Sequence, residues 1–293
     1  MENDCTKNQH YVPQGYLKNF TFDQQMTQIH CLNKLNDKKF ITNIRNVASE
    51  NYFYELPPDD AKKFETEMGY SDFNSDEKWF RNFESVALPL LDTLISICNN
   101  DHQDNLINFL YKEETRMWIG VFILLQFYRT KKFRQDLYKE GLSLGEQTVK
   151  ERSDYSKEQL VADAQKYSIF QQIINYLDIY KLNDEVNLIG NYLWQIGRND
   201  IEIPLVTSDS PIIELITNFA NGISVKTWVF PLNDKYCLCI YFDFFTGKLR
   251  YLTHQPIIDL NKVGILLYNS LQLKQAHTFV FSKLPIISGF FNN

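Results

Sequence analysis

The sequence predicts an α+β fold in which a helical middle section separates two β-rich sections. Residues 10–55 hold short apolar runs between turn residues, residues 59–199 repeat apolar positions every three or four residues, and residues 200–293 return to β-branched and aromatic runs. Strands grouped at both ends, without alternation with helices, are typical of α+β proteins. We therefore expect a single domain, 1–293, in which the N-terminal hairpin and the C-terminal strands share one sheet.

The composition favours a folded chain with a large apolar core. Hydrophobic residues make up 44% of the 293 residues and aromatic residues 15%, which excludes a disordered chain. The five cysteines form no CxxC pair, so we expect reduced thiols and a cytoplasmic location. Cys237 and Cys239 alternate in an apolar run and are expected on one face of a strand as small apolar residues. The most apolar window, 117–128, is too short to span a bilayer and predicts a buried helix, and the polar N-terminus does not resemble a signal peptide. We expect no membrane partner.

The individual elements follow from periodicity and turn residues. Asn and Asp at 33–37 predict a hairpin between two short strands, and Asn221-Gly222 and Asn233-Asp234 predict two more hairpin loops. The expected helices cover residues 59–100, 103–140, 157–182, 184–197 and 261–276. The expected strands cover residues 28–32, 38–41, 203–206, 212–216, 225–232, 236–244 and 278–281.

The net charge of −6 argues against a protein that coats DNA through a broad positive field. A locally basic cleft remains compatible with this charge. Four cations cluster after the apolar window, at Arg129, Lys131, Lys132 and Arg134. They predict either local, salt-sensitive binding of nucleic acid or, equally, basic residues that complement a helix C-terminus.

No motif of an easily recognised reaction is present. The sequence lacks GxxxxGK[ST], GxGxxG, HExxH, GxSxG and paired CxxC motifs, which excludes the most readable nucleotide-binding, zinc-protease and serine-hydrolase classes. The histidines show no ligand-like spacing, so a histidine zinc site is not expected. An enzyme whose site is assembled from distant segments is still possible.

Three polar features could carry chemistry. His10 precedes Pro13, whose extended segment could hold an acid or base rigidly, although a histidine that only fills a gap is the simpler interpretation. Gln126 and Arg129 lie three residues apart at the end of an apolar helix, where a guanidinium could bind phosphate. Asp209 lies in a Pro-fixed turn between apolar runs, a place that suits a base, a metal ligand or a simple Asx turn.

Together with other short motifs, these features resemble a bacterial family called domain of unknown function 4238. The matching segments run in order along the chain and begin at the His-Tyr-Val-Pro motif of 10–13. The others are 46–50, 83–91, 126–130, 207–213, 230–232, 267–269 and 276–280. Two positions depart from the family pattern: Ser210 stands where Asn is expected, and Gly15 stands where a bulky aromatic residue is expected, which predicts open space beside His10.

The resemblance implies a shared site, and it supplies no reaction. The implied site residues are His10, Glu84, Gln126, Arg129, Asp209 and Asn269. In the reading that we favour, the protein is a nuclease-like or nucleotide- or phosphodiester-directed hydrolase, in which His10 is the acid or base and Arg129 holds phosphate. Asp209 and Glu84 would bind a divalent ion or orient water, and Gln126 and Asn269 would contact the substrate.

Two other readings of the same polar residues stay open. The first is a non-enzymatic module that recognises a peptide or nucleotide in the same cleft. The second is a buried structural network with no ligand. Convergence of the polar residues in an open pocket would favour an enzyme or a sensor, whereas convergence without solvent access would favour the network.

Overall fold

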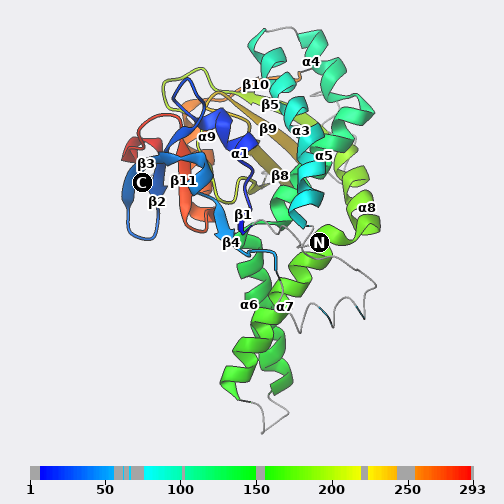
Figure 1. Cartoon of the computed structure of the whole chain (residues 1–293). Coiled ribbons are helices and arrows are strands. Elements are labelled where there is room, and N and C mark those ends of the chain that lie inside the picture. The colour runs from blue at the N-terminus through cyan, green and yellow to red at the C-terminus, as the bar shows by residue number, and fades with distance from the viewer. Residues whose placement is uncertain are drawn as a thin grey trace.

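The computed structural model describes residues 7–55, 62, 66, 76–100, 103–149, 156–218, 224–242 and 255–291. Within this part of the chain it contains eight α-helices and eleven strands, in the predicted order of strands, helical middle and strands (Figure 1). The α+β class is therefore confirmed. The Asn221-Gly222 loop lies outside the described residues.

The N-terminal hairpin pairs with C-terminal strands, as predicted. Strands β2 (Gln28–Asn33) and β3 (Lys38–Asn43) flank the predicted turn, and β2 pairs antiparallel with β11 (Phe279–Ser282). With β6 (Thr207–Ser208) they form a sheet in the order β3-β2-β11-β6. Strand β1 (Asn8–His10) pairs separately with β4 (Ser49–Asn51).

The remaining C-terminal strands form a second sheet that the sequence did not predict. Its order is β10-β5-β9-β8-β7. The strands are β5 (Leu193–Arg198), β7 (Ile213–Asn218), β8 (Ser224–Pro231), β9 (Tyr236–Phe242) and β10 (Ile257–Asp259). Cys237 and Cys239 are buried on one face of β9, with their Sγ atoms 3.9 Å apart, which confirms that they act as small apolar residues.

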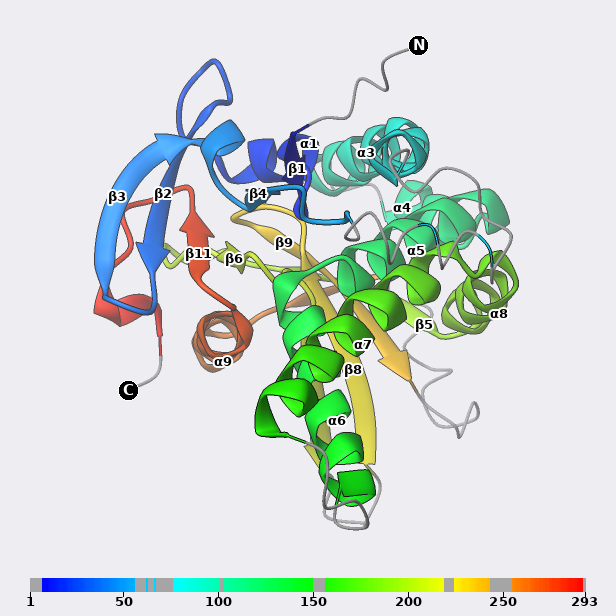
Figure 2. The ribbon, with the colours of Figure 1, turned by 60° about the horizontal axis from the view of Figure 1, so that its bottom comes forward.

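The first helix of the helical section whose bounds the structure describes is α3 (Asp76–Asn99), and the section packs beside the five-stranded sheet (Figures 1 and 2). Most of 59–75, the first part of the expected helix 59–100, lies outside the described residues. The other helices are α4 (Gln103–Leu110), α5 (Glu113–Tyr128), α6 (Lys131–Val149), α7 (Lys157–Leu177) and α8 (Ile179–Gly190), with α1 (Gln14–Leu17) and α9 (Lys262–Gln275) outside the section. Helix α5 carries the apolar window and is buried on nearly every side, as expected of a central helix. Helices α6 and α7 pack together as a hairpin that projects from the body (Figure 1).

Several element predictions were wrong, including the expected helix 157–182, which is divided between α7 and α8. The segment 103–140 holds three helices, and α6 continues through the expected break at 141–145. The expected helix 184–197 ends at Gly190, and its second half is strand β5, which pairs with β9 and β10. The apolar residues of this segment fit a helical period, but sheet pairing buries Trp194 and Ile196 completely and overrides local periodicity. The expected strand 203–206 is irregular, and the strand begins at Thr207.

The main apolar cluster contains side chains from all three sections of the chain. Tyr16 comes from the N-terminal motif, Phe122 from α5 and Phe230 from β8, and all three are buried. The rings of Tyr16 and Phe230 stack with centroids 4.9 Å apart. The Tyr16 hydroxyl also donates to the Pro231 carbonyl at 2.7 Å, so the N-terminal motif is fixed directly to the second sheet.

Candidate functional site

Arg129 lies in a buried network at the end of α5. It is 2% exposed, and its Nη1 forms an ion pair with Glu84 Oε1 at 2.7 Å. Its Nε and Nη2 donate to Gln126 Oε1 at 3.3 and 3.2 Å, and the guanidinium lies over the Phe80 ring at 5.1 Å. These three predicted site residues therefore do converge, but in the interior, where the guanidinium is already engaged by protein groups.

The same network holds the N-terminal motif. Gln126 Nε2 donates to the Tyr11 carbonyl at 2.9 Å, and the Tyr54 hydroxyl lies 3.4 Å from the His10 carbonyl and 3.5 Å from the Arg129 carbonyl. The His10 ring is half-buried, and its Nε2 bonds the Arg45 carbonyl at 3.2 Å. His10 and Arg129 are therefore linked through their backbone carbonyls, which both contact the Tyr54 hydroxyl.

The space expected from Gly15 beside His10 is filled. A Cβ at Gly15 would lie 2.5 Å from Leu88 Cδ1, so this side chain of α3 occupies the place of the missing aromatic ring. A larger residue at position 15 would therefore require the end of the Leu88 side chain to shift.

Asp209 is fully buried and acts as a clamp on the main chain before β11. Its Oδ1 accepts from the His277 N–H at 2.8 Å, and its Oδ2 accepts from the N–H groups of Thr278 and Phe279 at 2.7 and 3.0 Å. Burial raises the pKa of this carboxyl to about 6, against the lowering effect of the three hydrogen bonds and of Lys131. Both oxygens are thus occupied by backbone donors.

Asn269 is also fully buried, on α9, and lies in a different set of contacts. Its Oδ1 accepts from the Val206 N–H at 3.0 Å, and its Nδ2 donates to the Pro204 carbonyl at 2.9 Å. The Asn269 amide thus pairs with backbone groups of the irregular segment before β6 and holds this segment against α9. It does not join the network of Arg129.

A divalent-ion site at Asp209 and Glu84 finds no support in their contacts. Asp209 is held by backbone N–H groups, and Glu84 pairs with Arg129. Among the described residues there is no group of three or more His, Cys, Asp and Glu side chains that could hold a metal ion.

The basic cluster occupies an unexpected position, the first turn of α6. Arg129 ends α5, whereas Lys131, Lys132 and Arg134 lie at the start of the next helix, whose first turn holds no acidic residue. The Thr130 hydroxyl accepts from the Phe133 N–H at 3.2 Å in the manner of an N-cap. Complementing a helix C-terminus therefore does not explain these three cations, because they lie at the positive end of the α6 dipole.

Each of these cations has a partner within the protein. Lys131 Nζ pairs with Glu50 at 2.5 Å, and Lys132 pairs with Asp136 one turn along α6. Arg134 stacks on Phe53 at 3.8 Å and donates to the Phe53 carbonyl and to Gln172, both at 2.6 Å. Arg134 is therefore structural, while the two lysines and their carboxylates lie nearer the surface.

His277 and Lys131 line one open cavity at the base of the α6–α7 hairpin, which we call the α6 cleft. The cavity measures about 310 Å³ and is lined by Glu50, Phe53, Lys131, Arg134, Gln135, Tyr138, Gln165, Ser168 and His277. The half-buried His277 ring bonds the Thr278 hydroxyl through Nδ1 at 2.8 Å. Burial lowers its pKa, as do Lys131, Lys34 and Lys132, so the ring is neutral near pH 7.

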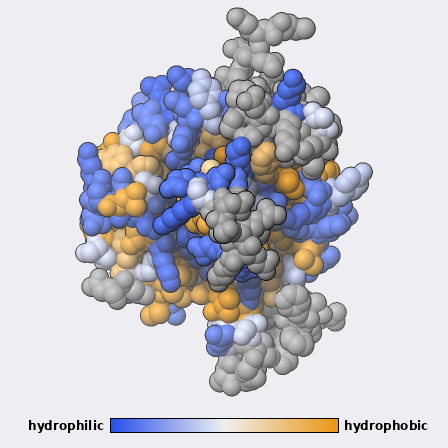
Figure 3. All heavy atoms as spheres, turned by 90° about the horizontal axis from the view of Figure 1, so that it is seen from below, coloured by the Kyte–Doolittle hydropathy of each residue, from blue (hydrophilic) through white to orange (hydrophobic). Residues whose placement is uncertain are grey.

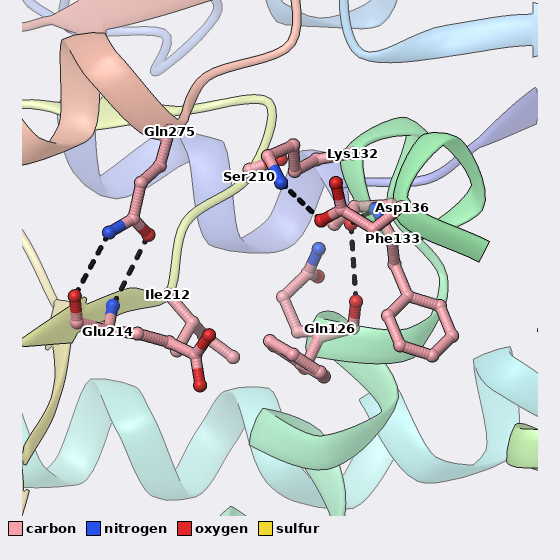
Figure 4. A pocket seen from close by; sticks show the side chains of 10 residues that line it. Gln126, Lys132, Phe133, Asp136, Ser210, Ile212, Glu214 and Gln275 are labelled. Atoms are coloured by element: carbon pink, nitrogen blue, oxygen red, sulfur yellow. Dashed lines mark hydrogen bonds and ion pairs between the residues drawn. The ribbon is translucent and has the colours of Figure 1, made fainter. Parts of the chain in front are cut away.

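A second pocket, of about 330 Å³, lies between the end of α5, the start of α6 and strand β7. Figure 4 shows Gln275 joined to the backbone of Glu214 through both ends of its amide, and Lys132 joined to Asp136. Ser210 lines this pocket, and its buried Oγ has no hydrogen-bond partner among the described residues. The departure from the family pattern at position 210 thus leaves an unpaired hydroxyl.

The structure divides the predicted site into an interior and a surface. His10, Glu84, Gln126 and Arg129 belong to one network, Asp209 is a separate buried clamp, and Asn269 lies elsewhere. The α6 cleft is lined by His277 and Glu50, which the sequence did not predict as site residues, and by Lys131 and Arg134 of the basic cluster. The predicted site residue Gln126 lines the second pocket, together with Lys132 (Figure 4). His277 lies inside a family-like segment, 276–280, and that position was the signal that could have identified it.

The fold and these contacts define a class of α+β protein in which a buried polar network supports a basic cleft at a helix N-terminus. A family model described as "Protein of unknown function (DUF4238)" matches residues 8–284, and the chain belongs to this family. No curated protein and no solved structure matches the chain. No described helix has the length and apolar character needed to cross a membrane.

Proposed function

We propose that this protein binds a phosphate-bearing ligand, a nucleotide or a phosphodiester, in the α6 cleft. The observation that carries the proposal is the first turn of α6, which places three cations and no acid at the positive end of a 19-residue helix. Cations at this positive end of the dipole are repelled by it and lower the stability of the helix. An anion bound there is stabilised by both the dipole and the cations. The open cavity gives a ligand access to this turn.

Lys131 is the cation best suited to contact the ligand. Its partner Glu50 has a side chain that is 51% exposed, and the carboxylate occupies the position that a phosphate oxygen would take. A surface ion pair of this kind is weak and exchangeable. Arg134, in contrast, is held by Phe53 and Gln172 and supplies positive potential from behind the cavity.

Hydrolysis of the ligand would depend on His277 and not on His10. The His277 ring lines the cleft, it is oriented by the Thr278 hydroxyl, and burial lowers its pKa. In the tautomer whose Nδ1–H donates to the Thr278 hydroxyl, the Nε2 of the neutral imidazole can accept a proton from an attacking water. Developing charge on the phosphate would be stabilised by Lys131 and the α6 dipole.

Binding is tested with three variants and a panel of inorganic phosphate, ATP and a short oligonucleotide, by calorimetry at low salt. We expect Lys131→Met to weaken binding about tenfold. Glu50→Gln removes the competing carboxylate and should tighten binding several-fold. The matched control is Lys157→Met, an exposed lysine at the start of α7, which should leave affinity unchanged. No binding of any of these ligands by the unaltered protein would contradict the proposal.

Turnover is tested with ATP and the oligonucleotide, in the unaltered protein and in His277→Ala. Hydrolysis that disappears in His277→Ala while binding persists supports the phosphodiester hydrolase. The second candidate is a recognition module without turnover, and it is favoured by the full engagement of Asp209, Gln126 and Asn269 in structural bonds. Binding without hydrolysis in the unaltered protein would select this candidate.

A further inference from the structure

The largest of the three cavities that we describe lies away from the α6 cleft, between the N-terminal hairpin, the end of α9 and the C-terminal segment. It measures about 580 Å³, within the range of small-molecule sites. We call it the hairpin cavity. Figure 2 shows β2, β3, α9 and the C-terminal segment together at one side of the molecule.

The floor of the hairpin cavity is apolar. Leu32 of β2 and Ile286 are buried in a cluster separate from the main core, and Leu273 and Phe291 pack against that cluster. Ile287, in contrast, is 55% exposed at the cavity. A large apolar side chain left at the edge of a concave apolar surface is a feature of binding sites.

The rim of the hairpin cavity is cationic. Lys34, Lys39 and Lys274 line it together with a single carboxylate, Asp37, so its net charge is opposite in sign to that of the whole chain, −6. Figure 3 shows that hydrophobic patches on the side of the β2–β3 hairpin are bordered by hydrophilic residues. An apolar floor beneath a cationic rim is complementary to a molecule with an aliphatic part and an anionic end.

Of the three rim lysines, the exposed Lys39 and Lys274 are available to a ligand, whereas Lys34 is engaged by the protein. Lys34 donates to the carbonyls of Lys274 and Ala276 at 3.0 and 2.5 Å and so completes the C-terminal end of α9. Lys39 stands directly opposite Leu32 in the β2–β3 register, so its side chain lies on the same sheet face as the floor. Lys274 reaches the rim from the last turn of α9.

We propose that the hairpin cavity binds a monomeric aliphatic carboxylate, with its chain on the apolar floor and its carboxylate between Lys39 and Lys274. The floor excludes water from the chain, and the lysines provide the charge complement. The site is independent of the α6 cleft and requires no reaction there.

The test is titration of the folded protein with decanoate, below its micelle concentration and at low salt. We expect saturable binding with one site, and an affinity about tenfold lower in Lys39→Gln/Lys274→Gln, because each exposed ion pair changes affinity a few-fold. Ile287→Asp should abolish binding, since it places a carboxylate at the edge of the apolar floor, where it repels the carboxylate of the ligand. Lys262→Gln, an exposed lysine at the opposite end of α9, is the matched control and should bind as the unaltered protein does.

Decanol supplies a comparison that needs no variant. It has the same chain without the charge, and it should bind the unaltered protein about tenfold more weakly than decanoate does. Absence of saturable decanoate binding, or equal affinities for decanoate in the unaltered protein and the double lysine variant, would overturn the proposal. Binding to vesicles of phosphatidylglycerol without binding of free decanoate would also overturn it, in favour of adsorption to a lipid surface.

Discussion

Replacing Asp209 should destabilise the protein strongly, because the carboxylate satisfies three buried backbone N–H groups at 2.7 to 3.0 Å. Each buried N–H left unpaired costs about 1–3 kcal/mol, and water that enters the space of the lost side chain offsets part of this. We therefore expect Asp209→Ala to lower the free energy of unfolding by about 3–5 kcal/mol. Asp209→Asn keeps one acceptor oxygen but turns its amide N–H toward a backbone N–H, and should cost about 2 kcal/mol.

The same variants should change how stability depends on pH. Burial raises the pKa of Asp209 from 3.8 to about 6, so the folded state binds a proton that the unfolded state has released between about pH 4 and about pH 6. Stability from this group is present below the unfolded pKa and is lost as pH rises through the folded pKa. The difference between the pKa of Asp209 in the folded state and in the unfolded state corresponds to about 3 kcal/mol of stability.

The assay is urea denaturation of the unaltered protein and of Asp209→Asn at several pH values across this window. The asparagine does not titrate, so the stability advantage of the unaltered protein should shrink as pH rises. An advantage that grows with pH would show that the backbone hydrogen bonds outweigh burial. Unchanged stability of Asp209→Ala would refute the clamp itself.

Three further substitutions separate structure from function. Arg129→Ala leaves Glu84 without its buried partner, so it should lower the free energy of unfolding by about 3–5 kcal/mol in denaturation experiments. Full stability together with lost ligand binding would instead indicate that Arg129 contacts the ligand. His10→Ala should change the melting temperature little and leave ligand binding unchanged, since the ring is half-exposed and contacts a backbone carbonyl. Loss of binding without loss of stability would show that His10 is a site residue. Gly197→Ala should destabilise by about 1–3 kcal/mol, because its Cβ would lie 2.7 Å from Cys237 Sγ; a stable variant would show that β5 and β9 can separate locally.

The sequence by itself determined the order of the sections, the hairpin at 33–37, the burial of α5 and the role of the paired cysteines of β9. These features depend on local patterns: turn residues, a two-residue or a three- to four-residue period, and a run of apolar side chains. It also indicated the polar residues of the family motifs. Such residues recur in buried networks and in active sites alike, so their types alone could not distinguish the two.

Only the tertiary structure decided which polar groups are available to a ligand. Arg129 is buried because α3 and the N-terminal motif close over the end of α5, and Asp209 is occupied because the chain before β11 passes beside its turn. Lys131 lies at a helix N-terminus because α5 ends at Tyr128 and a new helix, α6, begins at Lys131, where the sequence predicted one continuous helix. In these contacts, exposure and hydrogen-bond occupancy depend on residues 45 to 115 positions apart in the sequence, and no local pattern records them.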